Sequence, residues 1–390
     1  MSEKIKDDLA IYIHWPFCTS KCPYCDFNSH VRAEVDQKSM AQAYIRELKN
    51  VAKSINGNAG SVSSIFFGGG TPSLMPPKTV EQILHTISDL WQINTSVEIT
   101  MEANPGSTDE ARFSEYKTNG VNRLSLGVQS LNESALKFLG REHSVKDSLS
   151  SINVAAKLFS RVSLDLIYGR PKQSSTSWEQ ELSAALKLPI QHISLYQLTI
   201  EKGTPFYSDV RKRKFIMPEN DTQAEMFKIS NLLTKHAGMS AYEISNYALP
   251  GEFSRHNFSY WLYSPYVGVG PGAHGRLPIL GQGRIATRGH AKPETWVNSV
   301  QTSGHGFASS SSLTQNEMAY EALMLGLRLK RGIKLTDFEN KTGVSIEKVI
   351  LAQKVNELKA ARLIDDSNHY LRLTEKGWPL LNSILNRIIF

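Results

Sequence analysis

Three cysteines are the residues of this chain best suited to chemistry. Cys18, Cys22 and Cys25 are its only thiols, and they share the stretch CTSKCPYC. An odd number of cysteines at this spacing does not suit a disulfide framework. A structural zinc ion takes four ligands, so His14 or His30 would have to complete a zinc site. A [4Fe–4S] cluster held by three thiolates leaves one iron open to an outside ligand, and the spacing favours this interpretation.

A repeated strand-then-helix rhythm would position the cysteines. Short apolar or β-branched runs alternate with helical stretches, which predicts an α/β fold of parallel strands with helices outside. Capping-box spacings predict helix starts at Ser107, Ser130 and Thr176. The six predicted strands are 9–17, 62–67, 97–102, 123–129, 161–168 and 192–198.

Chemistry in a parallel barrel gathers at the C-terminal ends of its strands. The glycine run before Thr71 could form a tight turn, or could let a ligand approach the backbone. Glu102 could be a surface carboxylate or a buried acid that needs a partner, Asp165 could be a buried acid held by hydrogen bonds, and Arg141 could pair with an exposed acid. Residues at or after the predicted strand ends are Cys18, Gly69, Gly70, Thr71, Glu102, Gln129, Arg141, Asp165, Tyr196 and Gln197.

The segment around the cysteines resembles the signature of radical S-adenosylmethionine (SAM) proteins, and YIHWPFC resembles their coproporphyrinogen dehydrogenase-like branch. The resemblance implies a partial (β/α)6 barrel. It also implies a [4Fe–4S] cluster on the three cysteines, with SAM chelated to the open iron. In that family, an electron from the cluster cleaves the sulfonium of SAM to methionine and a 5′-deoxyadenosyl radical.

The same resemblance implies the residues that contact SAM. It assigns the glycine run to the methionyl amino group, Arg141 to the SAM carboxylate, and Asp165 to the ribose. Tyr12 and Tyr24 could be core aromatics, but the resemblance places them near the carboxylate and the adenine. The implied SAM residues are Tyr12, Tyr24, Gly69, Gly70, Thr71, Glu102, Gln129, Arg141, Asp165 and Gln197. No catalytic side chain is assigned.

Phe27 separates two activities within that branch. Members with oxidase activity carry a fourth cysteine at this position and a longer segment before the cluster, whereas here only 17 residues precede Cys18. Both departures favour the HemW-type branch, whose members bind heme and are thought to transfer it to acceptor proteins. We therefore expect a heme chaperone. Oxygen-independent coproporphyrinogen III dehydrogenase is the first alternative, and a radical SAM modifier of nucleic acid is the second.

The chain after the sixth strand predicts two further parts. Residues 203–306 read as a barrel extension that follows the barrel domain of residues 1–202, and they contain HNFSYW and GVGPGAHG. His256 and His274 in these segments are candidate heme ligands, because neutral imidazole is the commonest ligand of heme iron. Packed histidines are the plainer interpretation.

Residues 307–390 read as a winged-helix-like domain, with 307–315 as a hinge and helices at 313–329, 335–342 and 345–363. The third helix mixes Lys and Glu, which argues against a nucleic-acid partner. We expect this domain to act as a lid or partner surface over the barrel. The sequence leaves dimerisation open.

Composition sets the remaining expectations. The charged start MSEKIKDDLA lacks the apolar stretch of a signal peptide, and no apolar run is long enough to span a bilayer. We therefore expect a cytoplasmic protein. The net charge of +7 would suit anionic ligands and allows peripheral association with an anionic membrane face.

Overall fold

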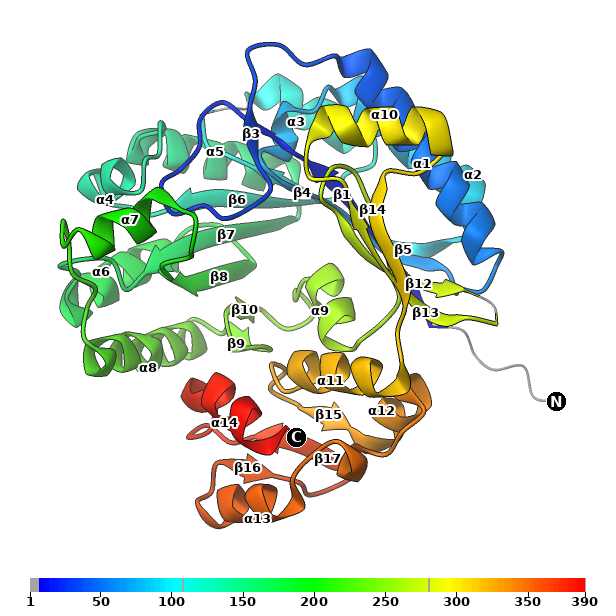
Figure 1. Cartoon of the computed structure of the whole chain (residues 1–390). Helices are drawn as coiled ribbons and strands as arrows, with labels where there is room; N and C mark the ends of the chain where they lie inside the picture. Colours follow the sequence, from blue (N-terminus) through cyan, green and yellow to red (C-terminus); the bar gives the residue numbers. More distant parts are fainter. Residues whose placement is uncertain (1–6, 107–108, 280, 390) are drawn as a thin grey trace.

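The computed structural model describes residues 7–106, 109–279 and 281–389 (Figure 1). Six neighbouring parallel strands form its centre and confirm the predicted α/β fold. Among the described residues β8 does not pair with β1, so the barrel is open, as the family resemblance implied. The six strands are β1 (Leu9–Trp15), β4 (Val62–Gly69), β5 (Ile93–Ala103), β6 (Arg123–Gln129), β7 (Arg161–Tyr168) and β8 (His192–Gln197).

Helices cover the outer face of these strands (Figure 1). The first of them buries Met40, Tyr44, Leu48, Val51 and Ile55, whose spacing of three or four residues puts them on one helix face against the strands. The helices of this layer are α1 (Gln37–Ile55), α2 (Pro77–Leu90), α3 (Glu110–Thr118), α4 (Glu133–Phe138), α5 (Val145–Leu158), α6 (Ser175–Ala185) and α8 (Asn220–His236). Helix α7 (Pro205–Arg211) instead packs at the barrel mouth, where the Phe206 N–H donates to the Pro23 carbonyl at 3.0 Å.

Two of the predicted capping boxes are wrong by two residues. Helix α4 follows Asn132, whose side chain accepts a hydrogen bond from the Ala135 N–H, and α6 follows Ser174. Ser107 lies outside the described residues, and α3 is capped by Asp109. Asn, Asp and Ser all make good N-caps, so several polar residues near each start competed for the role.

The region after β8 extends the sheet at both edges. Strand β11 (Tyr266–Val269) runs parallel beside β1, and antiparallel strands continue beyond it. The prediction of a hinge over 307–315 is wrong for its first six residues, because they form β14 and pair with β13. An exposed edge strand needs no apolar side chains, so the serine-rich sequence of β14 did not indicate a strand. The other added strands are β12 (His274–Ile279), β13 (Gly283–Gly289), β10 (Asn246–Ala248) and β9 (Ser240–Ala241).

The C-terminal part has its own hydrophobic core and a three-stranded sheet, in a winged-helix-like arrangement. The predicted single helix over 345–363 is wrong: a short 3-10 turn (Ile346–Lys348) precedes α13, and Ile350 between them is extended and bridges Ile389. Its elements are α11 (Gln315–Gly326), β15 (Ile333–Lys334), α12 (Leu335–Thr342), α13 (Ala352–Ala360), β16 (Ile364–Asp365), β17 (Tyr370–Leu373) and α14 (Leu381–Ile388).

This C-terminal part covers the barrel at the end where the parallel strands begin. Lys341 of α12 pairs with Asp7, two residues before β1, at 3.7 Å. Glu321 of α11 accepts hydrogen bonds from Arg276 at 2.6 Å and from the Tyr263 hydroxyl at 2.8 Å. Figure 1 shows α11 below α9 (Arg255–Trp261), with the loop near β3 at the far side of the sheet. The domain therefore lies opposite the strand ends expected to carry chemistry.

No helix among the described residues combines the length and the apolar character needed to cross a membrane.

Candidate cluster and cofactor site

The C-terminal ends of the parallel strands surround a cavity of about 620 Å³. Parallel strands end at one edge, so residues distant in sequence meet there. The cavity is lined by all three cysteines and by every SAM residue implied by the resemblance except Tyr12. These lining residues are Cys18, Cys22, Tyr24, Cys25, Gly69, Gly70, Thr71, Glu102, Gln129, Arg141, Asp165 and Gln197.

Cys18 ends the short strand β2 (Phe17–Cys18), and Cys22 and Cys25 follow in the loop that leads to its paired strand β3 (His30–Val31). All three thiols are free and half-buried. Thr71 donates a hydrogen bond to the Cys18 sulfur at 3.4 Å, and the Arg141 guanidinium lies 3.5 Å from the Cys22 sulfur. Burial raises the pKa of the Cys18 thiol, whereas the Thr71 hydroxyl opposes that rise. These donors would stabilise thiolates, which are the form that binds iron.

The geometry favours an iron–sulfur cluster over a zinc ion. Among the residues that the structure describes, no group of three His, Cys, Asp or Glu side chains converges on one metal position. Both ring nitrogens of His14 are engaged, with the Tyr12 hydroxyl at 3.0 Å and the Asn28 carbonyl at 2.9 Å. His30 Nε2 lies 3.1 Å from the Ala291 carbonyl. His14 therefore has no ring nitrogen left to complete a zinc site, and three thiols that do not converge on one point suit the corners of a larger cluster.

The glycine run brings β4 against the cysteine loop. Gly69 adopts a φ of +119°, which favours glycine. A Cβ atom on Gly70 would lie 2.7 Å from the Phe17 carbonyl oxygen and 3.0 Å from the Cys18 sulfur. The Gly69 N–H also donates to Glu102 Oε2 at 3.3 Å. The glycines therefore serve both the tight turn and the close approach of backbone to the site.

Two half-buried carboxyl groups, of Glu102 and Asp165, lie at the base of the cavity. Burial and the neighbouring Asp165 raise the pKa of Glu102 to about 8. Burial raises the pKa of Asp165 to about 6, although hydroxyl groups of Ser194 and Ser125 oppose the rise. Arg123 and Arg141 only partly offset the burial of Asp165, so a positively charged or hydroxyl-bearing ligand would stabilise the pair. The ammonium and ribose groups of SAM fit this requirement.

The remaining lining residues are held from several elements. Arg141 donates to Asn104 Oδ1 at 2.5 Å and to the Gly127 carbonyl at 3.0 Å, which leaves its guanidinium beside the cysteine loop. Gln129 has a φ of +67°, and the chain directly after it is held because the Leu131 N–H donates to Glu181 at 2.9 Å.

Two further lining residues, Tyr24 and Gln197, contact segments beside the cavity. Tyr24 packs against Phe206 with ring centroids 6.4 Å apart, and the Gln197 amide donates to Gln223.

Sequence reasoning missed Asn104 as a site residue. Its amide donates to the Thr71 hydroxyl at 3.0 Å while its oxygen accepts from Arg141. It thus joins two residues that were expected to bind SAM. The available signal was its place directly after a strand, in the turn sequence ANPG.

Tyr12 and His256 face a second, inner cavity of about 170 Å³ instead of the barrel mouth. Glu102 and Asp165 line both cavities, so they separate the two spaces. Tyr12 does not line the cavity at the barrel mouth, so the cavity does not support the expectation that Tyr12 lies beside the SAM carboxylate. Its ring packs near His256, with centroids 6.2 Å apart.

The structure contradicts His256 as a candidate heme ligand. Its side chain is buried, with Nδ1 3.0 Å from the Ser64 hydroxyl and Nε2 2.8 Å from the Tyr260 hydroxyl. Both nitrogens that could bind iron are thus occupied, and burial lowers the pKa of the ring to about 3. His274 lies exposed at the start of β12 and does not line the main cavity.

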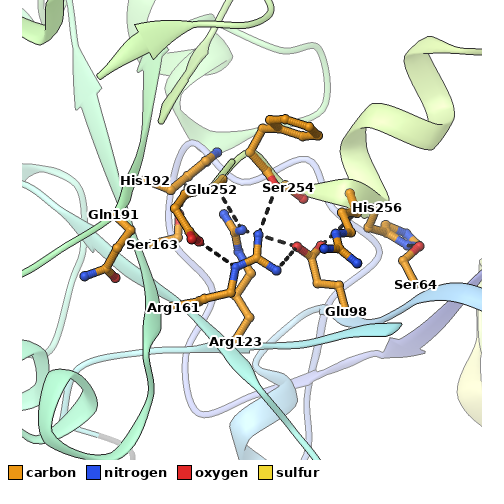
Figure 2. Close-up of polar contacts among 12 residues, drawn as sticks. Ser64, Glu98, Arg123, Arg161, Ser163, Gln191, His192, Glu252, Ser254 and His256 are labelled. Atoms are coloured by element: carbon orange, nitrogen blue, oxygen red, sulfur yellow. Dashed lines mark hydrogen bonds and ion pairs between the residues drawn. The ribbon is translucent and has the colours of Figure 1, made fainter. Parts of the chain in front are cut away.

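A buried ionic network holds α9 under the inner cavity (Figure 2). Glu98 accepts from Arg123 at 3.3 Å, from Arg161 at 2.9 Å and from the His256 backbone N–H at 3.2 Å. Arg161 also pairs with Glu252 at 2.7 Å. These contacts explain why charged residues occur inside strands β5, β6 and β7, and they fix the HNFSYW helix as the floor of the barrel.

Comparisons with known proteins agree with this geometry. The Radical SAM superfamily model matches residues 12–184, and the HemN C-terminal domain model matches residues 313–380. Heme chaperone HemW from Escherichia coli (strain K12) is 36% identical over 379 residues, covering 97% of each chain.

Two further relatives extend the comparison. A mitochondrial radical S-adenosyl methionine domain-containing protein 1 from Bos taurus is 36% identical over 96% of this chain and 86% of its own. Coproporphyrinogen III oxidase (HemN) from Escherichia coli shares the fold, with a TM-score of 0.80 at 19% identity over 99% of this chain and 91% of that one. The chain therefore belongs to the radical SAM superfamily, in the branch that contains the HemW and HemN proteins.

Proposed function

We propose that this protein is a heme chaperone, which binds heme and transfers it to an acceptor protein. We further propose that the cavity at the barrel mouth holds a [4Fe–4S] cluster and SAM. The name and 36% identity of the Escherichia coli relative support the first proposal. The observation that carries it is Phe27, which lines that cavity and leaves 61% of its surface exposed.

The position of Phe27 favours binding a flat apolar ligand. An exposed aromatic ring at a cavity rim gains hydrophobic stabilisation when a planar group covers it. Heme offers such a plane. In the oxidase members a fourth cysteine stands here, so this chain has an aromatic contact surface where those members have a thiol.

His274 is the better of the two histidine candidates for the heme iron. No hydrogen bond joins its ring to another side chain or backbone group in the part of the chain that the structure describes. Partial burial and the nearby Arg288 and Arg276 lower its pKa, which keeps the imidazole neutral and able to bind iron. Arg288 lies opposite His274 in the β12–β13 pair and is exposed, so it could contact a heme propionate.

Different residues of the cavity would hold the cluster and SAM. Cys18, Cys22 and Cys25 would hold the cluster. Glu102 would face the positive groups of SAM, and Arg141 offers planar donors that suit its carboxylate. Once bound, the cluster and SAM would supply one-electron chemistry. The carboxyl groups and the guanidinium orient the ligand, and the glycine run lets the backbone reach it.

A nucleic-acid role has weaker support. Lys354 and Arg387 both pair with Glu357, at 2.9 Å each, on and beside α13. Their charges are therefore satisfied within the domain instead of forming a stripe for phosphates.

Anaerobically reconstituted protein should be assayed side by side for heme binding, for heme transfer to a heme-free acceptor, and for coproporphyrinogen III conversion. We expect a Soret band and transfer, with little conversion. His274→Ala should weaken heme binding, whereas His85→Ala, an exposed histidine on α2, should not. A variant with all three cysteines changed to alanine should still bind heme. Efficient conversion without transfer would replace this proposal with the oxidase.

A further inference from the structure

Asn28 joins the cysteine loop to two distant parts of the chain. Its amide nitrogen donates to the carbonyl oxygens of Pro271 at 2.8 Å and Ala291 at 2.9 Å. Its own backbone carbonyl accepts from His14 Nε2 at 2.9 Å. Only the NH2 group of an asparagine can donate to two carbonyls, so these contacts determine which end of the Asn28 amide is the nitrogen.

The partner of Asn28 is itself firmly anchored. Pro271 belongs to the GVGPGAHG segment, whose Gly270 N–H donates at 3.0 Å to the buried carboxylate of Glu47. The same carboxylate accepts from the Trp296 indole at 3.0 Å and from the Gly306 N–H at 2.6 Å. Helix α1 therefore holds the segment at Gly270 and joins it to Trp296 and Gly306 through the same Glu47 side chain.

The glycines of this segment allow the close contact. A Cβ atom on Gly272 would lie 2.4 Å from the Asn28 amide nitrogen, and Gly272 has a φ of +78°. Its N–H donates to the His290 carbonyl at 2.9 Å, so this backbone is held on its other side. The GVGPGAHG segment thus forms a rigid contact surface for Asn28, which explains Gly272 without assigning it to a ligand.

We infer that Asn28 is a positioning residue for the [4Fe–4S] cluster, acting by latching the Cys25 side of the cysteine loop onto the GVGPGAHG segment. The inference rests on the proposed cluster at these cysteines. Three thiolates hold such a cluster with no spare ligand, so release of one side of the loop exposes it to loss. Asn28 follows Cys25 by three residues, and β2–β3 closes only the base of the loop.

The test compares Asn28→Asp and Asn28→Ala with matched changes at Asn58. The Asn58 amide also donates to a proline carbonyl, that of Pro278 at 3.1 Å, but it joins the end of α1 to β12. Aspartate keeps the size of asparagine but cannot donate, and it places a carboxylate against two carbonyl oxygens. If Asn28 acts through its hydrogen bonds, Asn28→Asp should accelerate loop cleavage and iron loss at least as much as Asn28→Ala. If Asn28 acts through packing alone, Asn28→Ala should accelerate both processes more than Asn28→Asp.

Two measurements apply to each variant. In metal-free protein, trypsin cleavage after Lys21, within the loop, should accelerate roughly 10- to 30-fold in Asn28→Asp, because two hydrogen bonds that oppose loop opening are lost. In reconstituted protein, transfer of iron to a ferrous chelator should accelerate by a similar factor. Melting temperatures of the metal-free Asn28 and Asn58 variants should be alike, so that global unfolding does not account for the difference.

Each outcome decides between the alternatives. Wild-type rates of cleavage and iron loss in Asn28→Asp would overturn the latch. Faster cleavage with unchanged iron loss would overturn the positioning role. Equal acceleration in the Asn58 variants would overturn it as well, because the effect would then be general. If the wild type takes up no iron, the proposed function fails, and the trypsin measurement still decides whether the latch exists.

Discussion

Removing the Glu98 carboxylate should destabilise the protein more than any change at the exposed end of the same network. Glu98→Ala leaves Arg123, whose side chain is 2% exposed, with the Glu252 backbone carbonyl at 3.0 Å as its remaining hydrogen-bond acceptor among the described residues. The His256 N–H at the start of α9 loses its acceptor too. Breaking a buried pair and leaving one charge behind typically costs about 3–5 kcal/mol.

Glu252→Gln is the matched control. Its carboxylate pairs with Arg161, but it is 31% exposed, and Arg161 keeps its contact with Glu98. Exposed pairs contribute at most about 1 kcal/mol, because water replaces the lost partner. The two changes therefore compare the loss of stability at a buried and at a partly exposed carboxylate of one network.

Thermal unfolding of the metal-free variants, followed by circular dichroism, measures the difference. At roughly 2 °C per kcal/mol for a large domain, Glu98→Ala should melt about 6–10 °C lower, and Glu252→Gln within about 2 °C of the wild type. A Glu98→Ala protein that melts as high as the control would refute the reasoning. It would mean that water enters the floor of the barrel and solvates Arg123.

Four other substitutions test the site and its floor. Cys22→Ala should abolish the cluster, measured as iron and sulfide content after anaerobic reconstitution; near-normal content would show that Cys22 is not a ligand. Glu102→Ala and Arg141→Ala should each weaken SAM binding roughly ten- to a hundredfold by calorimetry, because one charge-assisted contact is lost; unchanged affinity in both would reject these assignments. His256 has a pKa lowered to about 3, so below its usual pKa the unfolded chain binds more protons than the folded one, and stability falls from about pH 6.5 toward pH 4. His256→Asn should make that fall shallower by about 1.4 kcal/mol per pH unit in urea titrations of metal-free protein, and an unchanged slope would contradict the buried neutral ring.

Local sequence determined the parts of this protein that depend on near neighbours. The spacing of Cys18, Cys22 and Cys25 set the chemistry that one short loop can perform. Alternating apolar runs and helices predicted six parallel strands, and parallel strands end at one edge. For that reason residues as distant as Glu102, Arg141 and Gln197 could be placed in one cavity without coordinates, and the structure brings them together there.

Tertiary structure alone decided the parts that depend on distant partners. The HNFSYW pattern does not reveal which way His256 faces, because its ring is held by Ser64 from β4 and its helix by Glu98 from β5. The serine-rich strand β14 exists because β13 supplies its hydrogen bonds. The side of the barrel that the C-terminal domain covers follows from contacts such as Lys341 with Asp7. Hydrogen bonds and ion pairs between segments hundreds of residues apart leave no periodic pattern in either segment, so only the folded chain defines them.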